Sequence, residues 1–495
     1  MKLLFASSEV VPFSKTGGLA DVAGALPIEV SKLGAEVAVF TPAYDCLKNG
    51  DVEFKDIGLE LSVMIGQKEV GGRILKSTVA GGVTVYAIDQ PHYFSRSGLY
   101  GEDGQDYPDN CERFVFFCRG IMESIRLMDW WPDLIHANDW QTSLLPVYLK
   151  TEFAETPGYK DIVSLLTIHN LAYQGSFWHW DMLLTGLDWK HFNWQEMEFY
   201  GRLNLLKSGI AFADAINTVS PTYAAEIQTA ELGCGLEGIL GHRSGVLSGI
   251  LNGIDSADWN PQIDRHIPVN YDVNSWSQGK AACKTSLLKL RGLEYKKNVP
   301  LIGIIGRMAS QKGWSLILQI MQHWLRDSDV QWMILGTGQS EYENGLAALA
   351  KSYPDKLSLE LGFSNELAHQ IEAAADIFLM PSEYEPCGLN QQYSLAYGTI
   401  PVVRSTGGLT DTVVDATQEN IINGIANGFR FDDFEAEQLN EALTRAVDTF
   451  YHHPQIWEQL VKCGMSQDWS WASGARKYYR LYEKTVAREL TTSHG

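Results

Sequence analysis

The chain of 495 residues is 45% hydrophobic and 20% charged, and its formal net charge is −21. It is too long for one hydrophobic core, so we expect two domains. The negative charge argues against nucleic acid as a partner, because such binding depends on Lys and Arg, but it permits one diphosphate bound by a few cations and helix N-termini. No apolar stretch reaches the roughly 20 residues of a membrane span. We expect a cytoplasmic protein with no membrane partner, with seven free cysteines and no structural zinc.

Short β-rich apolar runs alternate with segments of helical length along the whole chain. This alternation is typical of parallel sheets with crossover helices, so we predict an α/β fold in both halves. The predicted strands cover residues 1–6, 36–42, 134–137 and 163–169 in the first half, and 301–305, 330–335, 357–361, 377–380 and 400–403 in the second.

A segment rich in Asp, Asn and Pro, residues 252–298, separates the two halves. Such composition is typical of a domain boundary, which we place near residue 260. The predicted domains therefore cover residues 1–260 and 261–468. Residues 469–495 include an amphipathic, aromatic segment, which we predict to be a helix that packs back onto the first domain.

The tetrapeptide Thr-Gly-Gly-Leu occurs at 16–19 and again at 406–409, each time where a helix is expected after a strand. Glycine lets backbone N–H groups approach an anion, and a helix N-terminus carries partial positive charge. A tight strand-to-helix turn is the better explanation for one isolated copy. Two copies favour an anion site, because open α/β sheets bind ligands at the carboxyl ends of their strands. We therefore expect a cleft between the domains that is lined by both loops.

Two further segments of the second half follow predicted strands. Arg307 and Lys312 follow the strand at 301–305, with a spacing that suits a diphosphate, although a solvated basic turn would look the same. Preorganised cations stabilise the charge that develops on a leaving diphosphate. Glu385 follows another strand and can bind sugar hydroxyls, while the N–H groups from Cys387 onward can face a phosphate. Alternatively, Glu385 only complements a helix dipole.

Polar side chains also follow two strands of the first half. His169 and Asn170 stand at the end of one strand, and Asp139 and Trp140 at the end of the other. These side chains can bind a carbohydrate through hydrogen bonds and an aromatic face, but a His at a strand end is as often a core residue. The aromatic segment 178–181 likewise either contacts a glucan or packs in the core.

Taken together, these blocks resemble the bacterial glycogen synthases and plant starch synthases, glycosyltransferases with the two-domain GT-B fold. The resemblance covers essentially the whole chain and implies two Rossmann-like domains that face an interdomain cleft, the first for the acceptor and the second for a nucleotide sugar. Its motifs are Lys-Thr-Gly-Gly-Leu-Ala-Asp-Val at 15–22, Asn-Asp-Trp at 138–140, Thr-Ile-His-Asn-Leu-Ala-Tyr-Gln-Gly at 167–175, Thr-Val-Ser-Pro-Thr-Tyr at 218–223, Leu-Asn-Gly-Ile-Asp at 251–255, Ser-Gln-Lys-Gly at 310–313, Glu-Pro-Cys-Gly-Leu at 385–389 and Thr-Gly-Gly-Leu at 406–409.

The resemblance implies retaining transfer of glucose from ADP-glucose to the nonreducing 4-hydroxyl of an α-1,4-glucan or maltooligosaccharide, with release of ADP and without a metal or cofactor. Retention without a carboxylate nucleophile predicts a front-face displacement, in which the leaving phosphate accepts the proton of the acceptor hydroxyl. The implied catalytic residues are Asp21, His169, Arg307, Lys312 and Glu385. The implied contacts to the nucleotide sugar are Lys15, Gly18, Asn252, Phe363, Cys387, Gly388, Leu389 and Asn390. The implied contacts to the glucan are Asp139, Trp140, Asn170 and Tyr173.

Three positions depart from the family's pattern. Gln141 stands where members often have His, Tyr393 where related enzymes have a second Glu, and Asn390 where bacterial members commonly have Thr. Two alternatives stay open: a non-catalytic glucan-binding or initiation protein of the same fold, and a transferase that uses UDP-glucose. The presence of Lys312 and Glu385 disfavours the first, because a non-catalytic protein would be expected to lose its charged site.

Overall fold

The structure, a computed structural model, describes residues 1–50, 52–102 and 104–492, which form two compact units. The first unit contains residues 1–252 and the C-terminal segment from Trp471, and the second is Gly253–Ser470. Residues 253–260, which the composition assigned to the first domain, thus group with the second unit, where the Ile254 N–H donates to the Trp469 carbonyl over 2.8 Å. Among the described helices, none combines the length and the hydropathy needed to cross a bilayer.

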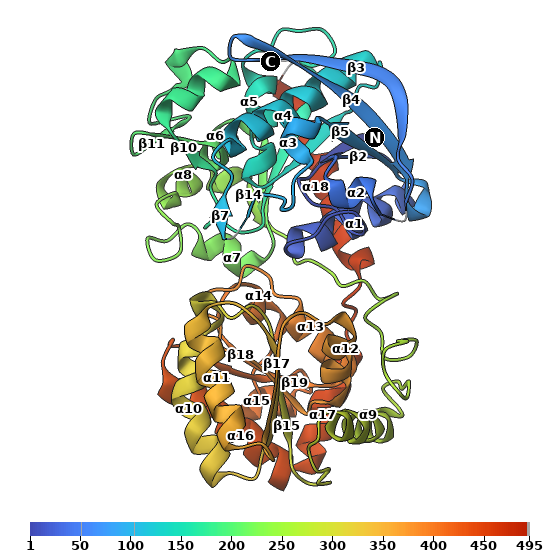
Figure 1. Cartoon of the computed structure of the whole chain (residues 1–495), viewed down its shortest axis with the longest axis vertical. Coiled ribbons are helices and arrows are strands. Elements are labelled where there is room, and N and C mark those ends of the chain that lie inside the picture. The colour runs from blue at the N-terminus through green and yellow to red at the C-terminus, as the bar shows by residue number, and fades with distance from the viewer. Residues whose placement is uncertain (51, 103, 493–495) are drawn as a thin grey trace. The chain divides into compact units, whose positions relative to one another are not determined.

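The first unit is built on a nine-stranded sheet with the order β14-β13-β9-β8-β1-β2-β5-β4-β3 (Figure 1). Its seven strands from β14 to β5 are parallel, whereas β4 pairs antiparallel with both β5 and β3. The strands are β1 (Lys2–Ala6), β2 (Glu36–Pro42), β3 (Lys55–Ile65), β4 (Lys68–Thr78), β5 (Thr84–Asp89), β8 (Leu134–Asn138), β9 (Val163–Ile168), β13 (Ala215–Thr218) and β14 (Leu247–Gly249). Small sheets add β6 (Gly101–Glu102), β7 (Gln105–Asp106), β10 (Ser176–Phe177), β11 (Glu198–Phe199) and β12 (Arg202–Asn204).

Both faces of this sheet are covered, because alternate residues of β1 belong to different cores. Leu4 and Ala6 pack in one hydrophobic cluster with α4, α5 and α6, and Leu3 and Phe5 pack in another with α1 and α18. The helices of the unit are α1 (Gly18–Lys32), α2 (Asp45–Lys48), α3 (Pro91–Phe94), α4 (Asn110–Leu127), α5 (Leu144–Lys150), α6 (Leu205–Phe212), α7 (Pro221–Glu226), α8 (Glu237–His242) and α18 (Trp471–Thr492).

The second unit has a six-stranded parallel sheet with the order β17-β16-β15-β18-β19-β20 (Figure 1). The strands are β15 (Leu301–Ile305), β16 (Gln331–Gly336), β17 (Leu357–Leu361), β18 (Ile377–Met380), β19 (Ile400–Arg404) and β20 (Phe429–Phe431). The helices are α9 (Trp276–Leu290), α10 (Trp314–Asp327), α11 (Ser340–Ser352), α12 (Asn365–Ala374), α13 (Asn390–Tyr397), α14 (Gly407–Thr412), α15 (Gln418–Ile422), α16 (Ala436–His452) and α17 (Pro454–Met465).

The sequence pattern explains these elements. Every strand predicted above is present with its ends within one residue, so the parallel α/β prediction is confirmed in both units. Helix α16 buries Leu439, Ala442, Leu443, Ala446 and Val447, a spacing that places all five on one face of a helix.

The C-terminal helix α18 packs on the first unit beside α1 and β9 (Figure 1). Its buried side chains include Tyr478 and Tyr482, which share a core with α1. The Tyr482 hydroxyl lies 2.9 Å from His136 Nδ1, and the Tyr478 hydroxyl accepts a 2.9 Å hydrogen bond from Asn217 Nδ2. His136 and Asn217 lie on β8 and β13, so the helix is bound by polar contacts as well as by apolar burial.

We predict that Tyr482→Phe destabilises the first unit by about 1–3 kcal/mol, because His136 Nδ1 would stay buried without its partner. Urea unfolding would measure the change. Tyr479→Phe is the matched control, since this half-buried ring lies on the same helix. Equal stability of Tyr482→Phe and the wild type would show that the Tyr482 hydroxyl does not help to anchor α18.

Candidate functional site

Polar residues collect after the carboxyl ends of parallel strands in the first unit. Glu9 and Gly18 follow β1, Asp139 follows β8, His169 follows β9 and Asn252 follows β14. Ligands of open α/β sheets bind at this edge. The Asn252 Oδ1 atom is buried and makes no hydrogen bond to any residue that the structure describes, so it is available as an acceptor for a ligand.

Asn138, Asp139 and His169 form one buried hydrogen-bonded group. The amide Nδ2 of Asn138 donates to the Ala6 carbonyl over 3.0 Å, which turns Oδ1 toward His169 Nε2 at 2.9 Å. Nε2 therefore carries the imidazole proton and donates it, while Nδ1 presents a lone pair. Burial lowers the pKa of His169 to about 3, so this imidazole is neutral at physiological pH.

Asp139 is a buried carboxyl group in an unusual backbone conformation. Its φ angle is 56°, in the left-handed region that non-glycine residues seldom occupy. Its Oδ1 accepts the His169 backbone N–H over 2.7 Å. Burial raises the pKa of Asp139 to about 7, although the backbone N–H groups of His169 and Asn170 oppose the shift. Strain and a displaced pKa at one residue are typical of functional sites.

The other predicted glucan contacts differ in exposure. The side chain of Tyr173 is 54% exposed, and Asn170 is half-buried with its Oδ1 accepting the Ala172 N–H over 3.0 Å. Trp140, in contrast, is only 9% exposed, and its ring packs against Phe114 and Phe177. We therefore assign Trp140 to packing beneath the site rather than to stacking on a sugar.

Gln141, which stands at a position where the family often has His, is also buried. Its Oε1 makes no hydrogen bond to the described residues, whereas its backbone carbonyl accepts from Cys118 Sγ over 3.3 Å. A buried amide oxygen without a hydrogen bond costs folding free energy. We therefore expect a donor group of a ligand or a water molecule next to it.

The first Gly-Gly loop is open to a ligand. A Cβ added at Gly17 or Gly18 would meet no atom of the described chain within 4 Å. Glu9 organises the loop, because its carboxylate accepts the Thr16 N–H over 2.5 Å and the Gly17 N–H over 3.2 Å. The N–H groups of Gly18 and Leu19 make no hydrogen bond to described residues, and they point out of the first turn of α1.

Charged side chains adjoin this loop. Lys15 Nζ forms a 2.7 Å ion pair with Asp21 Oδ1, and the Lys15 side chain is 52% exposed. The loop thus offers two N–H groups, a helix N-terminus and a cation to an anionic ligand.

The second Gly-Gly loop has a different role from the first, and the expectation of two equivalent anion loops is corrected. A Cβ on Gly407 would lie 2.0 Å from the Glu385 carbonyl oxygen, and one on Gly408 would lie 2.0 Å from that of Cys387. The Gly408 N–H already donates to the Glu385 carbonyl over 3.1 Å. These glycines are required because another backbone segment lies against them. The second copy therefore supports the Glu385 loop.

Lys312 and Glu385 form the charged centre of the second unit. Lys312 follows β15 and Glu385 follows the neighbouring strand β18, and Lys312 Nζ lies 2.5 Å from Glu385 Oε2. The same oxygen accepts the Ser382 hydroxyl over 3.1 Å. The Glu385 side chain is 8% exposed and that of Lys312 is 26% exposed, so the carboxylate is fixed and the ammonium still meets solvent. Arg307 is exposed after β15.

The residues after Glu385 lead into α13. Cys387 is buried, Gly388 has a φ of 70°, and Leu389 precedes the first residue of the helix. The Asn390 amide Nδ2 donates to the Ile305 carbonyl over 2.8 Å and so links α13 to the end of β15. Phe363, predicted to stack on a base, lies after β17 with 87% of its surface exposed.

Sequence reasoning missed Glu9, Asn138 and Ser382 as parts of these sites. A carboxylate three residues past the end of a predicted strand and close before a Gly-Gly loop is a signal that could have found Glu9. Asn138 lies in the motif at 138–140 and Ser382 lies just before the motif at 385–389, but only the fold reveals that they orient His169 and Glu385.

We predict that stability depends on pH through Asp139. The folded protein keeps this proton up to about pH 7, whereas the unfolded chain releases it near 3.8, so ionisation destabilises the fold as pH rises between these values. From pH 5 to 8 the wild type should lose on the order of a few kcal/mol of unfolding free energy relative to Asp139→Asn. Urea titrations at both pH values measure this. Asp161→Asn, at an exposed carboxylate, is the control, and parallel profiles for wild type and Asp139→Asn would refute the prediction.

The comparisons with known proteins agree with this geometry. Residues 2–242 match the model of the starch synthase catalytic domain, and residues 290–453 match that of the group 1 glycosyl transferases. The glycogen synthase of Rhodopirellula baltica is 45% identical over 98% of each chain, and that of Syntrophotalea carbinolica is 44% identical over 98% of this chain and 99% of its own. The catalytic domain of starch synthase IV from Arabidopsis thaliana, solved with ADP and acarbose, has a TM-score of 0.90 and 33% identity over 98% of this chain and 99% of its own. The chain therefore belongs to the glycogen synthase and starch synthase family of glycosyltransferases and has the GT-B fold of that family.

Proposed function

We propose that this protein transfers glucose from ADP-glucose to the nonreducing-end 4-hydroxyl of an α-1,4-glucan, with retention of configuration and release of ADP. The observation that carries the proposal is the ion pair between Lys312 and Glu385 at the strand ends of the second unit. The pair places Lys312, a cation that can bind a diphosphate, next to Glu385, a fixed carboxylate that can bind a sugar. The glycogen synthases at 44–45% identity and the ADP-bound starch synthase domain support the same activity.

On the donor side, charge stabilisation is the main contribution of the protein. Breaking the bond between glucose and diphosphate leaves negative charge on the phosphate oxygens, and preorganised cations and N–H groups stabilise that charge most strongly in the transition state. We assign Lys312 and the exposed Arg307 to the diphosphate from the second unit, and Lys15 and the free N–H of Gly18 from the first. Phe363 is free to stack on the base.

The transferred glucose would be held by neutral and charged acceptors. Glu385 Oε2 is occupied by Lys312 and Ser382, while its Oε1 makes no hydrogen bond to the described residues and can accept from a sugar hydroxyl. His169 Nδ1 offers a second acceptor, because Asn138 holds the imidazole proton on Nε2. Asp21 and the unsatisfied Asn252 Oδ1 complete the set that we assign to the donor.

The glucan acceptor is assigned to the first unit. Asp139, Asn170 and Tyr173 follow strands β8 and β9. Trp178 and Trp180 lie a few residues further on and are 59% and 49% exposed, so they are surface residues and not core residues. Exposed aromatic faces can stack on glucose rings of a long acceptor. We place the reaction in the cytoplasm, where the nucleotide sugar would be supplied.

We further propose that the transfer step needs neither metal nor cofactor. In a front-face displacement the departing phosphate oxygen takes the proton of the acceptor hydroxyl, while the glucose C1–O bond to phosphate breaks and the bond to the acceptor oxygen forms on the same face. The protein then supplies position and charge and no separate base.

We predict that the purified protein lengthens maltooligosaccharides with ADP-glucose and releases ADP. The measurement is incorporation of labelled glucose with ADP-glucose and UDP-glucose supplied separately and in competition, each with and without EDTA. ADP-glucose should be preferred, and EDTA should not change the rate. Preference for UDP-glucose would support the alternative donor, and no incorporation from either would leave the non-catalytic glucan-binding alternative.

A further inference from the structure

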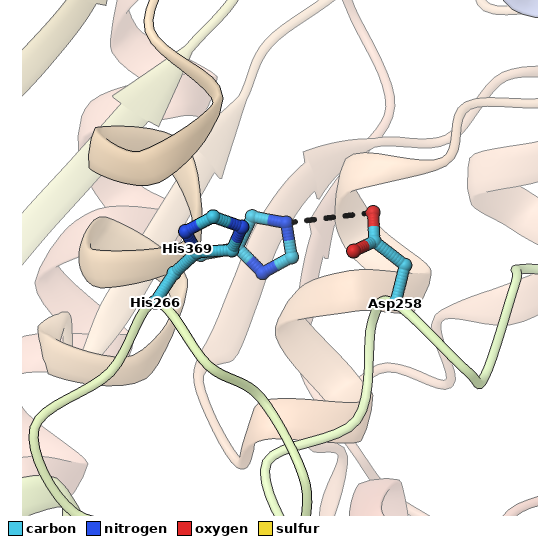
Figure 2. Close-up of side chains that lie close together, drawn as sticks. All are labelled: Asp258, His266 and His369. Carbon is cyan, nitrogen blue, oxygen red and sulfur yellow. Dashed lines mark ion pairs between the residues drawn. The ribbon is translucent and has the colours of Figure 1, made fainter. Parts of the chain in front are cut away.

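Three side chains with metal-binding atoms meet in the second unit, outside the residues assigned to glucosyl transfer. Asp258 and His266 come from the irregular segment before α9, and His369 comes from α12 (Figure 2). One ligand atom from each of the three lies within 4.8 Å of the others. Figure 2 shows the carboxylate of Asp258 facing the ring of His369, with the His266 ring beside it.

His369 is oriented as metal-bound histidines are. Its Nδ1 lies 2.8 Å from Asp264 Oδ2, and both side chains have no exposed surface. Tyr397 donates its hydroxyl to the same oxygen over 2.6 Å, which fixes the carboxylate in place. Nε2 then points to the cluster, where it is buried without a hydrogen-bond partner among the described residues and lies 3.7 Å from Asp258 Oδ2. A carboxylate behind the ring and an unmet nitrogen in front of it are the features that orient a ligating histidine.

Asp264 also positions the second imidazole. Its Oδ1 accepts the backbone N–H of His266 over 2.7 Å, and the rings of His266 and His369 have centroids 4.8 Å apart. The His266 Nε2 accepts a 3.4 Å hydrogen bond from Arg265, a weak contact that a cation would displace on binding this nitrogen. The charge of Arg265 is offset by the carboxylates of Asp258 and Asp264. One buried carboxylate thus holds two prospective ligands.

The donor set determines which cation fits. We propose that Asp258, His266 and His369 bind one Zn²⁺ ion, or another borderline divalent cation, at a structural site of this unit. Two imidazoles and a carboxylate suit zinc and disfavour Mg²⁺ and Ca²⁺, which prefer oxygen ligands. Ligand atoms around a tetrahedral zinc ion are about 3.4 Å apart. The Asp258 side chain is 43% exposed and so is free to approach, and a water molecule would complete the four ligands.

The ion would connect three segments of the second unit. Trp259 stacks between His369 and Tyr393, with ring centroids 3.7 Å and 3.8 Å away and interplanar angles of 12° and 11°. Tyr393 belongs to α13, the helix that follows the Glu385 loop. Zinc at His369 would therefore bind the segment before α9 to α12 and, through Trp259, to α13.

A proton on His369 competes with zinc for the same nitrogen. Burial of the imidazole lowers its pKa, but the contacts with Asp258 and Asp264 outweigh this effect and raise the pKa of His369 to about 9.

The test uses the full-length protein after EDTA treatment and dialysis. We predict that titration with ZnSO₄ yields one bound zinc per chain by mass spectrometry of the metal and raises Tm by several degrees, whereas MgSO₄ does neither. Asp258→Asn and His266→Ala should each weaken zinc binding at least tenfold and abolish the Tm rise. Both variants leave the buried pair of His369 and Asp264 intact. The control is His452→Ala, which removes an exposed imidazole 2.9 Å from Asp448 and should bind zinc as the wild type does.

Three outcomes would overturn the proposal. In the first outcome, the wild type does not bind zinc. The cluster would then be an ion pair between a protonated His369 and its carboxylate neighbours. Another is equal binding by the wild type, Asp258→Asn and His266→Ala, or loss of binding in His452→Ala, since the ion would then lie elsewhere. Co²⁺ bound to the wild type is a test without any variant: visible bands of a nitrogen and oxygen ligand set support the site, and intense sulfur-to-metal bands would instead assign the ion to thiols such as the exposed Cys46 and Cys234.

Discussion

The ion pair between Lys312 and Glu385 is the constraint on which the chemistry that we propose for the second unit depends. It joins the ends of the adjacent strands β15 and β18 over 2.5 Å, so the buried carboxylate is held in place while the ammonium still meets solvent. The backbone around it is fixed just as tightly, because a Cβ on Gly407 would lie 2.0 Å from the Glu385 carbonyl oxygen. Preorganised charge of this kind needs no rearrangement when a diphosphate leaves. Sheet order, glycine positions and the ion pair together fix the geometry of the donor site that we propose.

In the first unit, burial rather than the net charge of the chain determines the protonation state of the candidate site residues. Burial keeps His169 neutral and raises the pKa of Asp139 to about 7, and a hydrogen-bond chain from Ala6 through Asn138 fixes the tautomer of the imidazole. An ionised buried carboxyl costs stability, which is consistent with a site selected for binding and not for folding. The helix α18 packs on the same sheet and is anchored to His136 and Asn217, which lie on two of its parallel strands.

The sequence predicted the strands well because buried parallel strands are continuous apolar runs, and every such run was found within one residue of its place. It did not predict the hairpin of β3 and β4, whose alternating residues and Gly66 turn lie outside that pattern. It predicted Glu385 and Lys312 as site residues, and they are in contact. It treated the two Gly-Gly loops as equivalent because local sequence does not reveal what lies against a glycine. The cluster around His369 was also missed, since this residue lies more than 100 residues along the chain from Asp264 and His266 and only packing brings them together.

The most direct test of the central claim is the turnover of Lys312→Ala with saturating ADP-glucose and maltooligosaccharide. Lys462→Ala is the matched control, because it removes an exposed lysine that pairs with Glu458 in the same unit. The account predicts that turnover of Lys312→Ala falls roughly a hundredfold or more, as expected when one preorganised charge contact to the transition state is lost, while Lys462→Ala keeps the wild-type rate. Unchanged turnover of a folded Lys312→Ala protein would contradict it.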